Sequence, residues 1–237
     1  TIMRRSSRHR PKDLPRGLPG DHVHMDGFTV SPPAVLHKYD MVYVFVDRAT
    51  ECISVLFGNK NNTSVDMARN IWRIDRFYRM HGHKISSLQS DNYSTYVAEE
   101  TQDAEWAMSI QRVLKPPYIK EGLEELGVQR IKTMVKSLYA NAPYVPPQCW
   151  PYAILLSVVL LNLQRAPNCE SLTRIHAFTG VQPDWNRHPI DYFGAPYVVW
   201  QSKDKRQNTF SPNGQEAAYL CPCMESLPEV HYFCIFN

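Results

Sequence analysis

Two adjacent β-rich runs separated by a short polar segment constrain the fold of this chain most strongly. Residues 41–46 (MVYVFV) and 52–57 (CISVLF) are rich in β-branched and aromatic side chains, and residues 47–51 (DRATE) between them are mainly polar. This arrangement predicts a β-hairpin. Just upstream, residues 22–30 (HVHMDGFTV) alternate apolar and polar side chains and predict another strand. We therefore expect a three-stranded meander near the start of the folded part.

Longer segments with helical periodicity follow the meander. Residues 61–64 offer helix-capping side chains, and Gly82 ends the first helical pattern. We predict helices over residues 65–80, 95–108, 121–140 and 151–164, with short strands over residues 85–88 and 109–114. We expect core positions for Trp72, Phe77, Trp106 and Trp150. The order of these elements predicts an α/β fold of the ribonuclease H-like type, a mixed five-stranded sheet flanked by helices.

Composition divides the 237 residues into three parts. Residues 1–19 are predicted to form a basic linker, which either contacts phosphate groups or is an ordinary solvated leader. The basic side chains of this linker are Arg4, Arg5, Arg8, Arg10, Lys12 and Arg16, against one acid, Asp13. Residues 20–190 contain the predicted core. Residues 191–237 hold short β-like pieces separated by turns, and they predict a small C-terminal β appendage.

Bulk properties exclude several classes of protein. Hydrophobic residues make up 43% and charged residues 21%, which is typical neither of a disordered chain nor of a coiled coil. No apolar run reaches the roughly 18 residues of a membrane-spanning helix, and no signal-peptide pattern is present. The six cysteines form no CxxC pair and no zinc motif. We therefore expect an intracellular protein with reduced thiols.

Three acids stand where a metal-dependent phosphoryl-transfer site requires them. Such a site uses two divalent cations roughly 4 Å apart, and Mg²⁺ prefers carboxylate oxygens. Asp26 interrupts the first predicted strand, Asp91 follows the fourth, and Glu125 lies in the helix after residues 116–118. Taken singly, a strand-end Asp or a helical Glu is more typical of a turn or of a solvated surface. Asp26 fits such a non-functional role less well, because burying an unpaired charge in a strand is costly.

Several pieces of the sequence resemble, in order, the integrase core of long-terminal-repeat retrotransposons, most closely the copia type. The pieces are PGDHVHMD (19–26), VDRAT (46–50), YRMHGH (78–83), LQSDN (88–92), PYIKEGLEE (117–125), WPYA (150–153), LLN (160–162), Pro167, TG (179–180), Pro183 and FG (193–194). The resemblance covers about residues 19–200. It implies a ribonuclease H-like core in which Asp26, Asp91 and Glu125 hold Mg²⁺ or Mn²⁺.

The match around the third acid allows more than one register. Glu125 lies 34 positions after Asp91, close to the family's spacing, and this register needs no gap after residues 117–118. The adjacent Glu124 is the second choice. A rival register places Gln129 at the acid position and would leave no third carboxylate, since an amide cannot supply an anionic metal ligand.

The sequence also departs from the family pattern near this acid. The family's asparagine–glycine pair is Glu121-Gly122 here, and the arginine that usually follows the acid is Leu126. Gly127 falls inside the predicted helix, at a cost of about 1 kcal/mol relative to alanine.

A polar stripe continues along the same predicted helix. Gln129, Lys132 and Lys136 follow Glu125 at helical spacing and share one face. We interpret this face as a contact with the DNA backbone, with an ordinary solvated face as the alternative. The other candidate DNA-contacting side chains are Lys120, Arg130, Arg4, Arg5, Arg8 and Arg10.

Together these features predict a retroelement integrase core that trims the 3′ ends of element DNA and joins them to target DNA. The resemblance implies DNA and further copies of the chain as partners, no membrane, and a nuclear location. The alternative is a catalytically degenerate or host-recruited domain that binds nucleic acid or has a structural role. The departures near Glu125, and the lack of the family's His/Cys zinc motif in these residues, motivate it. It predicts that the three acids do not converge.

Overall fold

A mixed five-stranded sheet forms the centre of the molecule. The computed structural model describes residues 17–91, 98–114, 122–167, 169–184, 190–200, 214–222 and 231–235. The sheet contains β1 (Val23–Thr29), β2 (Met41–Asp47), β3 (Ile53–Gly58), β4 (Ser87–Ser90) and β5 (Gln111–Leu114), in the order β3-β2-β1-β4-β5. β1 pairs antiparallel with β2 and parallel with β4. The predicted meander and the ribonuclease H-like sheet are therefore confirmed.

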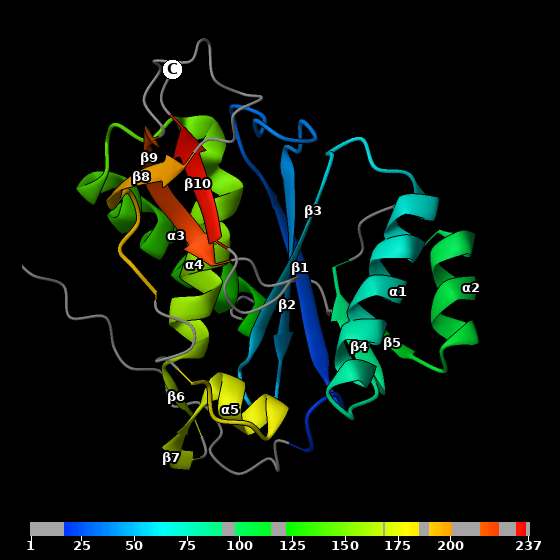
Figure 1. The fold of residues 1–237 in the computed structure, drawn as a ribbon. Coiled ribbons are helices and arrows are strands. Elements are labelled where there is room, and N and C mark those ends of the chain that lie inside the picture. Colours follow the sequence, from blue (N-terminus) through cyan, green and yellow to red (C-terminus); the bar gives the residue numbers. More distant parts are fainter. Residues whose placement is uncertain are drawn as a thin grey trace, which may run out of the picture.

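Helices cover both faces of this sheet (Figure 1). α1 (Ser64–Met80) and α2 (Glu99–Ala107) lie on one side, and α3 (Leu123–Asn141) and α4 (Trp150–Asn162) lie on the other. The side chains of β2 alternate between two cores: Tyr43 and Phe45 pack beneath α1, and Val42, Val44 and Val46 pack beneath α3. A strand buried on both faces is expected to be apolar throughout, which explains the MVYVFV run.

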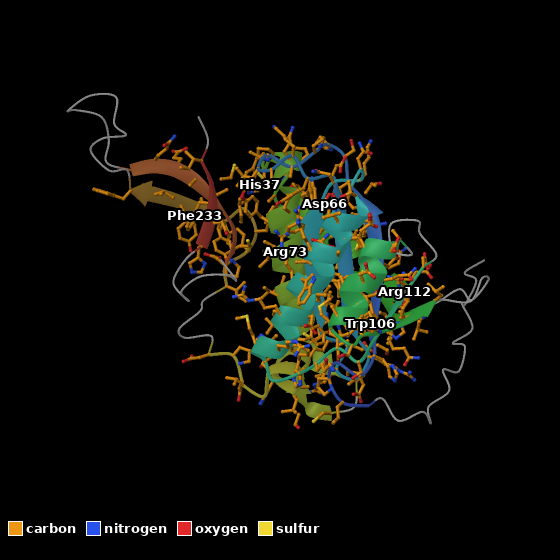
Figure 2. The ribbon with its side chains drawn as sticks, turned by 90° about the vertical axis from the view of Figure 1, so that its right-hand side faces the viewer. His37, Asp66, Arg73, Trp106, Arg112 and Phe233 are labelled. Atoms are coloured by element: carbon orange, nitrogen blue, oxygen red, sulfur yellow. The ribbon has the colours of Figure 1, made fainter. Side chains whose placement is uncertain are left out.

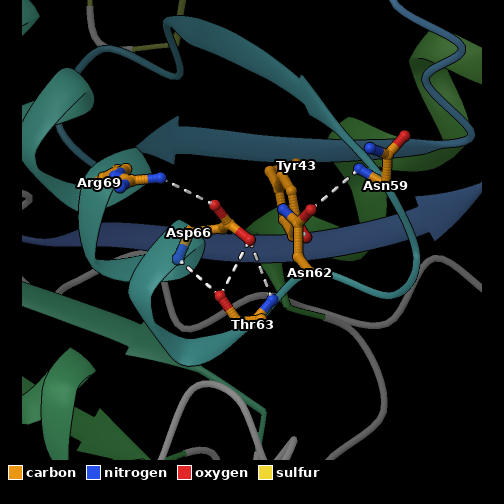
Figure 3. Close-up of polar contacts among 6 residues, drawn as sticks. All are labelled: Tyr43, Asn59, Asn62, Thr63, Asp66 and Arg69. Atoms are coloured by element: carbon orange, nitrogen blue, oxygen red, sulfur yellow. Dashed lines mark hydrogen bonds and ion pairs between the residues drawn. The ribbon is translucent and has the colours of Figure 1, made fainter.

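The start of α1 is fixed by a capping box (Figure 3). The hydroxyl of Thr63 accepts a hydrogen bond from the backbone N–H of Asp66 at 3.3 Å, and the Asp66 carboxylate accepts one from the Thr63 backbone N–H at 3.2 Å. The Thr63 hydroxyl also donates to the Asp66 carboxylate at 2.9 Å, and the two hydrogen bonds that this carboxylate accepts from Thr63 lower the pKa of Asp66. Arg69 lies 3.2 Å from the other Asp66 oxygen, as Figure 3 also shows. The predicted capping segment, residues 61–64, therefore contains the cap.

Gly127 lets α3 lie close against the sheet. A Cβ atom at this position would be 2.8 Å from Cγ2 of Val46 and 3.6 Å from Cγ1 of Val44. The glycine that lowers helix propensity in the sequence therefore permits a close approach to β2. This approach determines which side of α3 faces the sheet.

Asn162, at the end of α4, ties that helix to the edge of the sheet. Its side-chain amide donates to the carbonyl oxygen of Ile53 at 2.8 Å and its side-chain oxygen accepts from the Ile53 N–H at 2.8 Å. The contact is buried, so both backbone groups of this β3 residue are satisfied. The leucine–leucine–asparagine piece of the resemblance thus has a structural role.

A second, three-stranded sheet follows the core in sequence and packs on α4. Its strands are β8 (Pro196–Trp200), β9 (Gly214–Pro222) and β10 (His231–Ile235), in the order β10-β9-β8. Leu220 of β9 and Leu156 of α4 belong to the same buried cluster. The predicted C-terminal β appendage is confirmed. The short elements β6 (Arg165–Ala166), β7 (Cys169–Thr173) and α5 (Arg174–Thr179) were not predicted.

The tryptophans divide between core and surface. Trp150 is buried, as predicted, and Phe77 packs against the core beneath α1. The prediction is wrong for Trp72 and Trp106, whose exposed fractions are 51% and 86%. Both lie on helices but outside the strip that faces the sheet, and Figure 2 shows Trp106 on α2. Among the described residues, none of the helices is long and apolar enough to span a membrane.

Candidate metal site and nucleic-acid surface

Asp26 lies in the central strand, on the face covered by α3. In β1 it pairs with Val44, and His24 and Phe28, which share its face, pair with Val46 and Val42. These three valines belong to the core beneath α3. Asp26 is partly buried, and its Oδ1 atom accepts a hydrogen bond from the Gly27 N–H at 2.7 Å. A carboxylate in the middle of the sheet is thus directed toward α3.

Asp91 follows β4 directly and is exposed. The parallel register pairs Val23 with Leu88 and His24 with Gln89. This pairing ends at Gln89, and Asp91 follows two residues later, just past the end of β4. The two predicted aspartates therefore lie within one strand and just after its neighbour, Asp26 in β1 and Asp91 after β4.

The first turn of α3 presents its two adjacent glutamates in different directions. Glu124 is 3% exposed, and its Oε2 lies 3.1 Å from Nδ1 of His24 in β1. Glu125 is exposed. One residue rotates a helix by about 100°, so both side chains cannot face the sheet. The other buried residues of α3, Gly127, Val128 and Ile131, share the side of Glu124.

Gly122, the N-cap residue of α3, leaves room for the Glu124 carboxylate. A Cβ atom at Gly122 would overlap both carboxylate oxygens and Cδ of Glu124. Only glycine fits this position with Glu124 in its observed place. The glycine of the PYIKEGLEE piece therefore leaves space for the Glu124 carboxylate.

The predicted acids suit a hard divalent cation by their chemistry. Carboxylate oxygens are the donors that Mg²⁺ prefers. Within the described ranges, however, no three His, Cys, Asp or Glu side chains lie close enough together to form a metal site. Among the described residues, the structure thus brings Glu124 to β1 and places Asp91 just after the strand beside β1, but it does not assemble a complete ligand set.

Known proteins with a similar sequence or fold point to mobile genetic elements. No model of a protein family matches the chain. The chain is 25% identical over 217 residues to the Retrovirus-related Pol polyprotein from transposon RE2 of Arabidopsis thaliana. That match covers 86% of this chain and 14% of the polyprotein.

Solved structures share the fold. The integrase catalytic core domain of HTLV-2 in complex with magnesium has a TM-score of 0.51 at 20% identity, covering 68% of this chain and 97% of that domain. The intasome of simian T-cell lymphotropic virus with PP2A regulatory subunit B56 gamma gives a TM-score of 0.57 at 18% identity, covering 94% of this chain and 79% of that one. The BIV integrase catalytic core domain gives 0.51 at 17% identity, with 67% and 93% covered.

The chain resembles a retroelement integrase core. The polyprotein supports this in sequence, and the viral catalytic cores support it in fold. We refer to it below as the integrase-like core.

The predicted DNA-contacting side chains of the integrase-like core have different environments. On α3, Gln129 and Lys136 are exposed, and Lys132 is partly buried with its Nζ 4.5 Å from the centre of the Phe28 ring. Since Phe28 shares the face of Asp26, Lys132 brings a positive charge to the rim of the candidate site. Lys120, Arg4, Arg5, Arg8 and Arg10 lie outside the described residues.

Arg130, a candidate DNA-contacting residue, forms an ion pair within the protein. Its guanidinium lies 2.9 Å from Oε2 of the buried Glu51, in the turn between β2 and β3. Arg174, the first residue of α5, lies 3.4 Å from the same oxygen. Burial lowers the pKa of Arg174, and Arg130 adds to this effect, while Glu51 opposes it. We name Glu51, Arg130 and Arg174 the Glu51 cluster. It joins the hairpin, α3 and α5.

The hairpin turn holds a second buried acid, Asp47. Its carboxylate accepts hydrogen bonds from the Gly20 N–H at 2.8 Å, the Thr50 N–H at 2.9 Å and the Thr50 hydroxyl at 2.8 Å. Burial raises the pKa of Asp47, and these hydrogen bonds oppose that effect. Asp47 and Thr50 of the VDRAT piece therefore stabilise the hairpin turn.

Sequence reasoning missed the contact between His24 and Glu124. A signal for it was present, because His24 precedes Asp26 by two residues and so had to share its face of the strand. The orientation of α3, which buries Glu124 and leaves Glu125 exposed, had no comparable signal.

Proposed function

We propose that the integrase-like core catalyses divalent-metal-dependent processing of the 3′ ends of element DNA and their transfer into target DNA. Asp26, Asp91 and Glu124 would hold the cations. The observation that carries the choice of third acid is the buried contact of Glu124 with His24, on the same strand face as Asp26. Glu125, the acid preferred from sequence, is exposed one residue further along α3.

Each residue of the site would have a defined task. When bound, two Mg²⁺ or Mn²⁺ ions supply activation of the attacking oxygen and charge neutralisation at the leaving oxygen. The three carboxylates provide hard oxygen donors. Gln129, Lys132 and Lys136 would bind backbone phosphates and orient the strand along α3. Water would attack a phosphodiester near the element end and displace a 3′ oxygen, and the released 3′ hydroxyl would then attack a target phosphodiester and displace its 3′ oxygen. No covalent intermediate with the protein is needed.

A strand-transfer assay on a labelled DNA end tests the proposal and separates the two glutamates. The chain would be compared with Glu124→Gln and Glu125→Gln, which are isosteric changes at adjacent positions. Product that depends on Mg²⁺ or Mn²⁺ is expected from the unchanged chain and from Glu125→Gln. The Glu124→Gln variant is expected to fall to background, because it loses an anionic ligand.

Other outcomes would change the assignment. Loss of activity in Glu125→Gln alone would restore the sequence register with Glu125 as third acid. Activity that survives both substitutions would remove both glutamates from the site. Asp26→Asn serves as the positive control for inactivation, since both registers require that residue.

A second candidate function is supported by the lack of a three-ligand cluster among the described residues. In this reading the core keeps the fold and binds nucleic acid without catalysis. Unchanged DNA binding together with no strand transfer and no measurable Mn²⁺ binding would favour it over the enzyme.

Assembly into oligomers on DNA is part of the proposal. The HTLV-2 integrase core is described in dimeric and trimeric forms, and the simian virus structure is an intasome. We expect the integrase-like core to self-associate and to act in the nucleus. Light scattering of the purified chain with and without element-end DNA measures the first expectation.

A further inference from the structure

His24 and Glu124 form a buried link between the central strand and the start of α3. The Nδ1 atom of His24 lies 3.1 Å from Oε2 of Glu124, and the exposed fractions of the two side chains are 12% and 4%. The two residues are 100 positions apart in the sequence. A carboxylate oxygen only accepts, so Nδ1 carries the hydrogen in this contact and donates it.

This link limits the position of a side chain that would otherwise sample many rotamers. A glutamate has three rotatable bonds, and an isolated one at the start of a helix can point its carboxylate in several directions. Here the space above Gly122 admits the carboxylate, and His24 holds one of its oxygens. Both constraints act on the same group.

The strand side of the link is rigid and close to the first aspartate. His24 and Asp26 are two positions apart in β1, so they share a face and lie about 7 Å apart along the strand. β1 is the central strand of the sheet, paired on both sides. A carboxylate tied to His24 is therefore held at a fixed height relative to Asp26.

We propose that His24 is a positioning residue that orients the Glu124 carboxylate toward Asp26 for divalent-metal binding. The inference rests on the proposed function, in which Glu124 is a metal ligand. Donors that fix a ligating carboxylate typically change metal affinity by about 10- to 100-fold when removed.

A matched pair of substitutions tests the role of the donor. His24→Asn keeps an N–H donor near the position of Nδ1, whereas His24→Leu has nearly the same size and shape as asparagine without any donor. Mn²⁺ affinity of the full chain would be measured from the free Mn²⁺ signal in electron paramagnetic resonance, beside thermal unfolding midpoints. We expect affinity about 10- to 100-fold weaker in His24→Leu and within a few-fold of the unchanged chain in His24→Asn.

Two further variants keep the test decisive. His24→Gln moves the amide donor toward the Nε2 position and away from Glu124, so we expect its Mn²⁺ affinity to be about 10- to 100-fold weaker than that of the unchanged chain. This variant tests the donor if His24→Leu does not fold. His22→Asn is the matched control, because His22 contacts Ser87 (Nδ1 to Oγ, 2.6 Å) and not Glu124. Its Mn²⁺ affinity should not change.

Failure of this inference differs from failure of the proposed function. If Glu124→Gln weakens Mn²⁺ binding but His24→Leu and His24→Gln do not, Glu124 is a ligand and His24 does not position it. Equal losses in His24→Asn and His24→Leu would reduce His24 to a packing residue and also overturn the inference. If Glu124→Gln leaves Mn²⁺ binding unchanged, the proposed ligand set fails, and the role of His24 fails with it.

Discussion

At the scale of single residues, the direction in which a side chain points decides its burial and its partners more than its chemical type does. Glu124 and Glu125 are chemically the same and adjacent, yet one is buried against β1 and the other is exposed. Arg130 has the charge of a phosphate-binding residue, but its guanidinium pairs with Glu51. Both cases follow from the side of α3 on which each residue falls.

The Glu51 cluster gives a prediction about stability. Glu51→Gln would leave the guanidinium of Arg174, whose side chain is 7% exposed, without its anionic partner. We expect a loss of about 3 kcal/mol in the free energy of unfolding, because an uncompensated buried charge is costly. Urea denaturation measures it.

Arg130→Gln is the control for the Glu51 prediction. Arg130 is more exposed than Arg174, and after its substitution Glu51 still pairs with Arg174. We expect a loss of no more than about 1 kcal/mol, the range of exposed ion pairs. Equal losses in the two variants would contradict a central role for Glu51.

At the scale of elements, α3 is the part of the fold on which the candidate site depends. It supplies both glutamates, the polar stripe of Gln129, Lys132 and Lys136, and one member of the Glu51 cluster. Its orientation is set by the close approach of Gly127 to Val46 and Val44. A small shift of this helix would therefore move Glu124 relative to Asp26.

Gly127→Ala tests this dependence. Alanine raises helix propensity by about 1 kcal/mol, but its Cβ would be 2.8 Å from Cγ2 of Val46, too close for an unchanged structure. Overpacking of this kind costs about 1–3 kcal/mol, so we expect a net loss of stability together with weaker Mn²⁺ binding. Thermal unfolding and the Mn²⁺ assay measure the two effects.

An exposed position of the same helix provides the comparison for Gly127→Ala. Ser137→Ala also increases helix propensity, and Ser137 is exposed. We expect unchanged or slightly higher stability and unchanged Mn²⁺ binding. A stabilised Gly127→Ala variant would show that the helix can move away from β2 without cost.

At the scale of the whole molecule, the core and the C-terminal sheet share a continuous apolar interior. Leu156 of α4 and Leu220 of β9 are both at most 2% exposed and lie in one cluster. The sheet of β8, β9 and β10 therefore covers a face of α4 that would otherwise be exposed. The mostly apolar sequence of α4, buried on most of its surface, reflects its packing against both the central sheet and the C-terminal sheet.

Shared burial predicts cooperative unfolding. Leu220→Ala and Leu156→Ala should each cost about 2–5 kcal/mol and shift a single thermal transition, because each leaves a cavity in the same cluster. Calorimetry of both variants measures this. Two resolved transitions, with Leu220→Ala moving only one, would show that the C-terminal sheet unfolds on its own.

The sequence by itself determined the main elements of this protein, although not the short β6, β7 and α5. The hairpin of β2 and β3, the four long helices and the positions of Asp26 and Asp91 relative to their strands follow from local periodicity and turn residues, which are written in neighbouring positions. The order of the predicted elements and the resemblance to the integrase core both indicated the ribonuclease H-like fold. Strand alternation placed Asp26 on one face with His24.

Only the tertiary structure decided how the helices are rotated against the sheet. An apolar pattern marks a broad strip of a helix, and the part of that strip that is buried depends on its packing partner. Trp72 and Trp106 are therefore exposed although core positions were expected for both. The same rotation, set by Gly127 against β2, turns Glu124 toward His24 and leaves Glu125 at the surface, because residues adjacent in a helix point about 100° apart.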